Sequence, residues 1–121
     1  MGMVLLVDDE AACRAATTLL LRHLGYAVQT AAGAEEALAV FDPARHALVI
    51  TDNRMPGMSG AELAAELKRR APSTPVILYS GWPGAPLVSV DALIAKPASI
   101  CDFREALARL FPKEPVPARN P

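Results

Sequence analysis

Short apolar runs alternate with longer amphipathic segments along most of the chain. The runs are largely apolar throughout, which is typical of strands that are buried on both faces of a parallel sheet. The segments between them have the length and the apolar spacing of helices. The predicted strands are residues 3–7, 26–30, 48–51, 75–79 and 91–95, and the predicted helices are residues 10–24, 34–41, 59–71 and 99–111.

Residues that favour helix ends stand at the borders of these segments. Gly25 follows the first helix, at a position where glycine commonly ends a helix. Ser59 and Glu62 have the spacing of a capping box at the start of the third helix. Pro72 and Pro112 follow the third and the last helix, which they cannot continue. Because strands and helices alternate, the chain is predicted to form a doubly wound α/β domain with a five-stranded parallel sheet.

Polar side chains mark the carboxyl ends of four predicted strands. Asp8 and Asp9 follow the first strand, and Asp52 follows the third. Ser80 follows the fourth strand and Lys96 the fifth, whereas the second strand ends with no ionisable residue. In open parallel sheets, ligands bind at these strand ends. The pattern therefore favours the strand order 2-1-3-4-5, with the second strand at an edge and the polar residues around one crevice.

These strand ends predict a site for phosphoryl chemistry. A single aspartate after a strand is commonly a helix cap or a turn residue, but three carboxylates in one place repel one another unless a cation compensates them. Carboxylates with a backbone carbonyl form a hard oxygen site that suits Mg²⁺. Lys96 can pair with a carboxylate at rest and with a phosphoryl oxygen later, and Ser80 can donate a hydrogen bond to the same group. The set predicts an aspartate that accepts a phosphoryl group.

Composition narrows the classes of function. The 121 residues make one ordinary domain, with 52% hydrophobic and 21% charged residues. A net charge of −1 argues against a nucleic-acid or anionic-membrane surface, and no apolar run is long enough for a membrane span. Cys13 and Cys101 are too few for a disulfide framework or a zinc site, so a cytoplasmic protein is expected. Residues 112–121 are rich in proline and are expected to form a tail or the start of a linker.

Four motifs, in order and at plausible spacing, resemble the receiver domain of two-component response regulators. They are Leu-Leu-Val-Asp8-Asp9-Glu10, Ile50-Thr51-Asp52-Asn-Arg-Met55-Pro56-Gly57-Met-Ser-Gly60, Ile-Leu-Tyr-Ser80-Gly81 and Ala95-Lys96-Pro97. The resemblance covers residues 3–111 and implies a flavodoxin-like, chemotaxis-regulator-like fold. The expected organisation is a receiver domain at residues 1–111 with the proline-rich segment after it.

The resemblance also implies roles for individual residues. Asp52 is the implied phosphoacceptor, which takes a phosphoryl group from the histidine of a sensor kinase or of a phosphotransfer protein. Asp9, Asp52 and the backbone carbonyl of Arg54 are the implied Mg²⁺ ligands, and Asp8 assists through a coordinated water. Such a protein is a signalling module and not an enzyme.

The resemblance implies two further roles, and the chain departs from the family pattern nearby. Ser80 and Lys96 are expected to bind the phosphoryl oxygens, and the Lys96–Pro97 peptide is expected to be cis. Only 16 positions separate Ser80 from Lys96, with several glycines and prolines between them, so the family's fourth helix is expected to be short or absent. Leu93 stands where the family usually has a switching aromatic residue.

Three hypotheses remain beside the main prediction. The residues favour phosphotransfer to Asp52 that switches a protein-interaction surface, whereas Leu93 and the short segment favour a receiver-like module that works without phosphorylation. A phosphate-ester hydrolase is weaker, because it needs a second acid where Arg54 stands. A stacked pair of Arg54 and Trp82 that shields the acyl phosphate from water is a further hypothesis.

Overall fold

A computed structural model describes residues 2–81, 90–96 and 100–111 of the chain. Within these ranges it contains a five-stranded parallel sheet in the order β2-β1-β3-β4-β5, which confirms the predicted fold class and strand order. The strands are β1 (Met3–Val7), β2 (Val28–Ala31), β3 (His46–Asp52), β4 (Val76–Ser80) and β5 (Ala92–Ala95). The helices are α1 (Ala11–His23), α2 (Ala34–Val40), α3 (Gly60–Arg70) and α4 (Ile100–Leu110).

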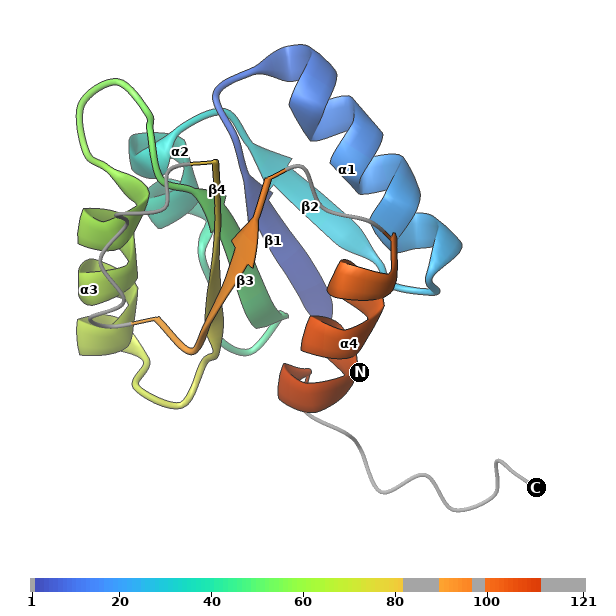
Figure 1. The fold of residues 1–121 in the computed structure, drawn as a ribbon. Helices are drawn as coiled ribbons and strands as arrows, with labels where there is room; N and C mark the ends of the chain where they lie inside the picture. Colours follow the sequence, from blue (N-terminus) through green and yellow to red (C-terminus); the bar gives the residue numbers. More distant parts are fainter. Residues whose placement is uncertain (1, 82–89, 97–99, 112–121) are drawn as a thin grey trace.

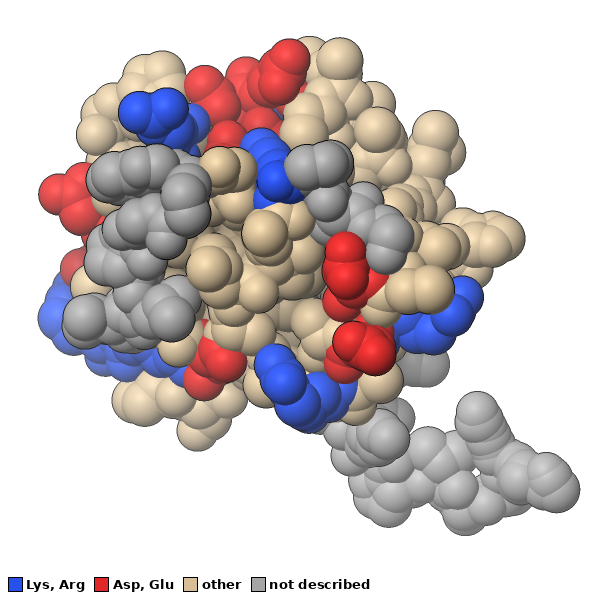
Figure 2. All heavy atoms as spheres, in the orientation of Figure 1, with Lys and Arg blue, Asp and Glu red and all other residues tan. Residues whose placement is uncertain are grey.

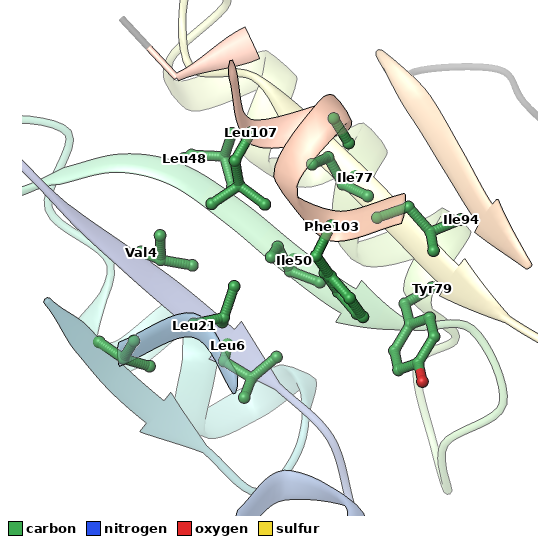
Figure 3. Close-up of a cluster of buried hydrophobic side chains, with 12 residues drawn as sticks. Val4, Leu6, Leu21, Leu48, Ile50, Ile77, Tyr79, Ile94, Phe103 and Leu107 are labelled. Carbon is green, nitrogen blue, oxygen red and sulfur yellow. The ribbon is translucent and has the colours of Figure 1, made fainter. Parts of the chain in front are cut away.

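Helices cover both faces of the sheet, as Figure 1 shows. On one face, Leu21 of α1 and Phe103 and Leu107 of α4 pack with residues of β1, β3, β4 and β5 in one buried cluster, drawn in Figure 3. On the other face, Ala37 of α2 and Leu63 of α3 belong to a second cluster with β1, β3 and β4. Two covered faces explain why the central strands are apolar throughout, because neither side of the pleat meets water.

The helix ends follow the signals in the sequence. The hydroxyl of Ser59 accepts a hydrogen bond from the Glu62 N–H at 3.1 Å, and the Glu62 carboxylate accepts one from the Ser59 N–H at 2.9 Å. This confirms the predicted capping box at the start of α3. Gly25 has a φ of 100° and its N–H bonds to the carbonyl of Arg22, so it ends α1 in the left-handed region that favours glycine.

The starts of β2 and β3 differ from the prediction by two residues, whereas the bounds of β4 and β5 differ by one residue at most. Strand β2 begins at Val28, because the N–H of Tyr26 still bonds to the carbonyl of Leu21 in the turn that ends α1. Strand β3 begins at the fully buried His46, which was not predicted to lie in the strand. The ring of His46 fits there because its Nδ1 accepts a hydrogen bond from the Asp42 N–H at 3.0 Å. The predicted start of this strand at Leu48 is therefore two residues too late.

Several predictions concern residues outside the described ranges. These are the short or absent helix between β4 and β5, the Arg54–Trp82 pair, the cis Lys96–Pro97 peptide and the proline-rich segment 112–121. Among the described residues, no helix combines the length and the apolar character that a membrane span requires.

Candidate functional site

Three carboxylates meet at the carboxyl ends of β1 and β3. Asp8 and Asp9 directly follow β1, and Asp52 is the last residue of β3. The parallel pairing places Val7 beside Thr51, so the residues that follow them emerge together. One oxygen from each of the three carboxylates lies within 4.8 Å of the others. Figure 2 shows acidic side chains gathered at this edge of the molecule, at the top of the view, with basic side chains next to them.

The three carboxylates differ in exposure. Asp8 is only 1% exposed, Asp52 is partly buried and Asp9 is exposed. The cluster is therefore anchored on one side in the protein and reached by solvent on the other. Close carboxylate oxygens with an open side are the hard donor set that Mg²⁺ prefers, because this ion keeps several waters and takes few protein ligands. The residues present fit such an ion.

The backbone and side chains around Asp8 hold it in place. Its N–H bonds to the carbonyl of Ala31 at 3.1 Å, and its Oδ1 accepts the N–H of Glu10 at 2.9 Å. The guanidinium Nη1 of Arg14, one turn into α1, donates to the Asp8 carbonyl at 2.6 Å. These three bonds fix the turn from β1 into α1. They thereby fix the position of Asp8 and of the backbone that leads into Asp9.

Lys96 supplies a positive charge to the cluster. Its Nζ lies 3.4 Å from Oδ1 of Asp52, and its backbone N–H bonds to the carbonyl of Ser80 at 3.0 Å. The ammonium also lies 4.8 Å from the centre of the Tyr79 ring. The end of β5 is thus held against β4 by the backbone, and the side chain reaches over β4 to β3.

The charges in the cluster perturb one another. Burial raises the pKa of Asp52, the positive charge of Lys96 lowers it, the negative charge of Asp8 raises it, and the net shift is upward. Burial alone would lower the pKa of Lys96, but the negative charges of Asp52 and Asp8 raise it overall. The single ammonium of Lys96 offsets only part of the formal negative charge of the three carboxylates. A cation at the open side would offset the remaining negative charge.

Cys13 of α1 faces the same cluster. Burial raises the pKa of its thiol to about 11, and a hydrogen bond to the Asp8 carboxylate acts in the same direction. The thiol is consequently protonated at neutral pH. The position of this cysteine beside Asp8 was not predicted.

The remaining predicted site residues lie close by along the chain. Ser80 is the last residue of β4 and is 3% exposed, with Ala95 beside it in the register of β4 and β5. Arg54 is exposed in the loop after β3. The structure therefore brings Asp8, Asp9, Asp52 and Lys96 together, with Ser80 at the end of the adjoining strand.

Sequence reasoning gave no role to the residues that seat α3 against the site. A β-carbon at Gly60 would lie 2.2 Å from the carbonyl oxygen of Asp52 and 2.8 Å from the Cα of Asn53, so only glycine fits there. The buried Asn53 receives the N–H groups of Gly60, on its carbonyl, and of Ala61, on its side chain, at 2.9 and 3.1 Å. A glycine directly after a capping serine was the available signal, since glycine is a poor helix former.

Comparison with known proteins identifies the family. The family model described as the response regulator receiver domain matches residues 4–108, and the chain therefore belongs to this family of two-component signalling modules. The transcriptional regulatory proteins FixJ of Rhizobium meliloti and GlrR of Escherichia coli are each 35% identical to the chain over 100 residues, which is 83% of this chain. The matches cover 47% of FixJ and 22% of GlrR, so the chain spans less than half of these relatives.

Solved structures give the same result. The response regulator TrrA of Thermotoga maritima, in complex with Mg²⁺ and BeF, has a TM-score of 0.85 and 31% identity, covering 91% of this chain and 99% of TrrA. The chemotaxis protein CheY4 of Vibrio cholerae has a TM-score of 0.82 and 29% identity, covering 91% of this chain and 98% of CheY4. The resemblance to receiver domains and to their fold is confirmed.

Proposed function

We propose that this receiver domain accepts a phosphoryl group on Asp52 and that the modification switches a protein-interaction surface. The observation that carries the proposal is the position of Asp52, which lies 3.4 Å from Lys96 and within 4.8 Å of two further carboxylates. A lone buried ion pair would need no extra acids, whereas a site that must bind both a cation and an anionic phosphoryl group needs both signs of charge.

The phosphoryl donor is a phosphohistidine of a sensor histidine kinase or of a phosphotransfer protein. A carboxylate oxygen of Asp52 attacks the phosphorus, the new P–O bond forms, and the P–N bond breaks with its electron pair returning to the imidazole. Lys96 balances the charge that spreads over the phosphoryl oxygens during transfer, because its ammonium already lies beside the attacking carboxylate. The Ser80 hydroxyl, at the end of the adjacent strand, donates a hydrogen bond to one of the same oxygens.

The proposed ligands of Mg²⁺ are the carboxylates of Asp9 and Asp52 and the backbone carbonyl of Arg54, with Asp8 acting through a water. When bound, the ion would neutralise the charge of the carboxylates and of the incoming phosphoryl group. The turn fixed by Arg14 and by the Glu10 N–H would hold the acids ready for it. The TrrA structure with Mg²⁺ and BeF supports this assignment, since TrrA is 31% identical to this chain.

A kinase partner and a cytoplasmic location complete the proposal. TrrA has also been solved in complex with the histidine kinase ThkA, in a structure that matches this chain with a TM-score of 0.84 and 30% identity. The domain is a signalling module and not an enzyme with its own turnover. We assign residues 1–111 to the receiver domain and residues 112–121 to a tail or to the beginning of a linker.

Beryllofluoride binding tests the proposal, because this anion mimics a phosphoryl group on an aspartate. We expect ¹⁹F NMR to show bound beryllofluoride in the presence of Mg²⁺, and to show none after Asp52→Asn or after chelation of the metal. Asp42→Asn, four residues before the start of β3, is the matched control and should bind as the wild type does. Binding that persists in Asp52→Asn would contradict the assignment.

A phosphorylation-independent interaction module is the second candidate. Leu93 favours it, because this β5 residue is aliphatic and 37% exposed. This candidate predicts that beryllofluoride and Mg²⁺ leave the protein unchanged.

A further inference from the structure

Tyr79 lies between the candidate site and helix α4. Its ring is 9% exposed and has Lys96 Nζ on one face, 4.8 Å from the ring centre. The ring also meets that of Phe103 in α4, with 5.0 Å between centres and an interplanar angle of 72°. Figure 3 shows Tyr79 near the end of β4, beside Phe103 and Ile94. One side chain therefore contacts both the ammonium that pairs with Asp52 and the core residue of α4.

The strand register explains this position. Tyr79 pairs with Asp52 of β3 on one side and with Ile94 of β5 on the other. Tyr79, Ile94 and Phe103 belong to the same buried cluster, so they share the face of the sheet that α1 and α4 cover. Lys96 follows Ile94 by two positions, and alternation along a strand brings its side chain back to that face. The ring consequently lies under the ammonium.

We propose that Tyr79 positions Lys96 and couples the charge on Asp52 to helix α4. The inference rests on the function proposed above and assigns a role to a residue outside the acid cluster and Lys96. At rest the ammonium is attracted both by Asp52, at 3.4 Å, and by the ring face of Tyr79. A phosphoryl group on Asp52 adds negative charge at Asp52 and none at the ring. It therefore draws the ammonium away from its present position over the ring.

The packing of the ring carries the change to α4. Tyr79 is nearly buried and meets Phe103 edge to face, in a cluster without room for a ring to move alone. Phe103 lies in the first turn of α4 and is 1% exposed. A shift of the Tyr79 ring is therefore passed to the first turn of α4, beside the strand β5 that leads to Lys96.

The other tyrosine of the chain is a matched control. The sequence has two tyrosines, and Tyr26 also packs against a phenylalanine, Phe111, with 4.9 Å between ring centres. Both pairs lie against the same face of the sheet, but Phe111 follows the last turn of α4, whereas Phe103 lies in the first. Loading the site should thus move the signals of Tyr79 and leave those of Tyr26 in place.

Ring-labelled tyrosine and phenylalanine, observed by ¹H–¹³C NMR, test the inference in the full chain. We expect Mg²⁺ with beryllofluoride to shift the ring signals of Tyr79 and Phe103 and to leave those of Tyr26 and Phe111 unchanged. In Asp52→Asn, none of these four signals should shift. Unchanged ring signals of Tyr79 and Phe103, with bound beryllofluoride visible by ¹⁹F NMR, would overturn the coupling and leave the proposed function standing. Absence of any bound beryllofluoride would overturn both.

Substitutions separate positioning from simple packing. Tyr79→Leu removes the ring face, which holds the ammonium only while the site is empty, and we therefore expect a two- to fivefold tighter affinity for beryllofluoride, about the size of an exposed cation–π contact, together with loss of the Phe103 shift. Tyr79→Phe keeps the ring and should restore both readouts. Tyr26→Leu should leave the affinity unchanged. Equal affinities in Tyr79→Leu and the wild type, or no rescue by Tyr79→Phe, would overturn the assignment.

Discussion

Gly60, the first residue of α3, lies directly against the backbone of Asp52: a β-carbon at position 60 would come within 2.2 Å of the Asp52 carbonyl oxygen. The proposed phosphoacceptor and the start of α3 are therefore in contact through the main chain. A side chain at position 60 must displace either the helix or the end of β3.

Gly60→Ala is accordingly expected to destabilise the domain and to weaken the site. We expect a loss of about 1–3 kcal/mol in the free energy of unfolding, which is the usual cost of adding side-chain atoms to a tightly packed region. The added methyl group would meet backbone atoms that cannot move aside. Urea unfolding measures this loss, and a beryllofluoride titration measures the effect on Asp52. Gly33→Ala is the control, since a β-carbon there meets none of the described atoms within 4 Å. A Gly60→Ala protein as stable as Gly33→Ala would contradict the prediction.

Arg14 is expected to tune metal binding without touching the ion. Its guanidinium donates to the Asp8 carbonyl at 2.6 Å and holds the turn that carries Asp8 and Asp9. We expect Arg14→Met to weaken Mn²⁺ binding about tenfold, because the loss of a group that orients metal ligands commonly has an effect of this size. Electron paramagnetic resonance of free Mn²⁺ measures the affinity. Arg22→Met, in the last turn of the same helix, removes the same charge and should have little effect. Equal Mn²⁺ affinities in the two variants would contradict the prediction.

Asp91 joins three elements at the opposite end of the sheet. Its Oδ2 accepts the N–H of Val76 at 2.7 Å and lies 2.7 Å from Nζ of Lys68 in α3. Asp91→Ala leaves the Val76 N–H without this acceptor, and we expect a loss of about 1–3 kcal/mol in the free energy of unfolding. Asp91→Asn keeps an acceptor and should lose less. Chemical unfolding compares these variants with Glu66→Gln, which breaks exposed ion pairs and should change stability little.

Buried His46 is expected to make stability depend on pH. Burial lowers the pKa of His46, the charge of Arg45 lowers it further, and Asp42 opposes the shift. Its Nδ1 accepts the Asp42 N–H, so the neutral ring carries its proton on Nε2, which lies 2.7 Å from Oε1 of Gln29. A folded-state pKa below the unfolded value of about 6.5 makes the unfolded chain bind the proton first. The stability is therefore complete above pH 6.5 and falls as the pH drops from there toward the folded pKa.

Unfolding curves at pH 7.5 and pH 5.5 check the prediction for His46. The stability difference between the two values should shrink in His46→Asn, which keeps a hydrogen-bond acceptor near the Asp42 N–H. The same difference in His46→Asn and in the wild type would contradict the prediction.

The sequence was sufficient for the features that depend on order along the chain. The strand order and the meeting of Asp8, Asp9, Asp52 and Lys96 follow from which strands end in polar residues, because parallel strands bring these ends to one edge. The capping box at Ser59 was predictable because it lies within four consecutive residues.

The features that depend on register and close packing were not predicted. The contact of Lys96 with the Tyr79 ring requires the pairing of β4 with β5, which no local pattern fixes. The fit of Gly60 against Asp52 requires the distance between a helix start and a strand end. The predicted third strand began at Leu48, and the buried position of His46 in β3 depends on a hydrogen bond with the backbone of Asp42.

Transfer of one phosphoryl group to Asp52 is the central claim, and intact mass spectrometry tests it most directly. The protein is incubated with acetyl phosphate and Mg²⁺, beside Asp52→Asn, Asp42→Asn and a sample treated with a metal chelator. We predict one added phosphoryl group in the wild type and in Asp42→Asn, and none in the other two samples. An adduct that forms on Asp52→Asn or without metal, or a wild type that takes neither acetyl phosphate nor beryllofluoride, would contradict the account.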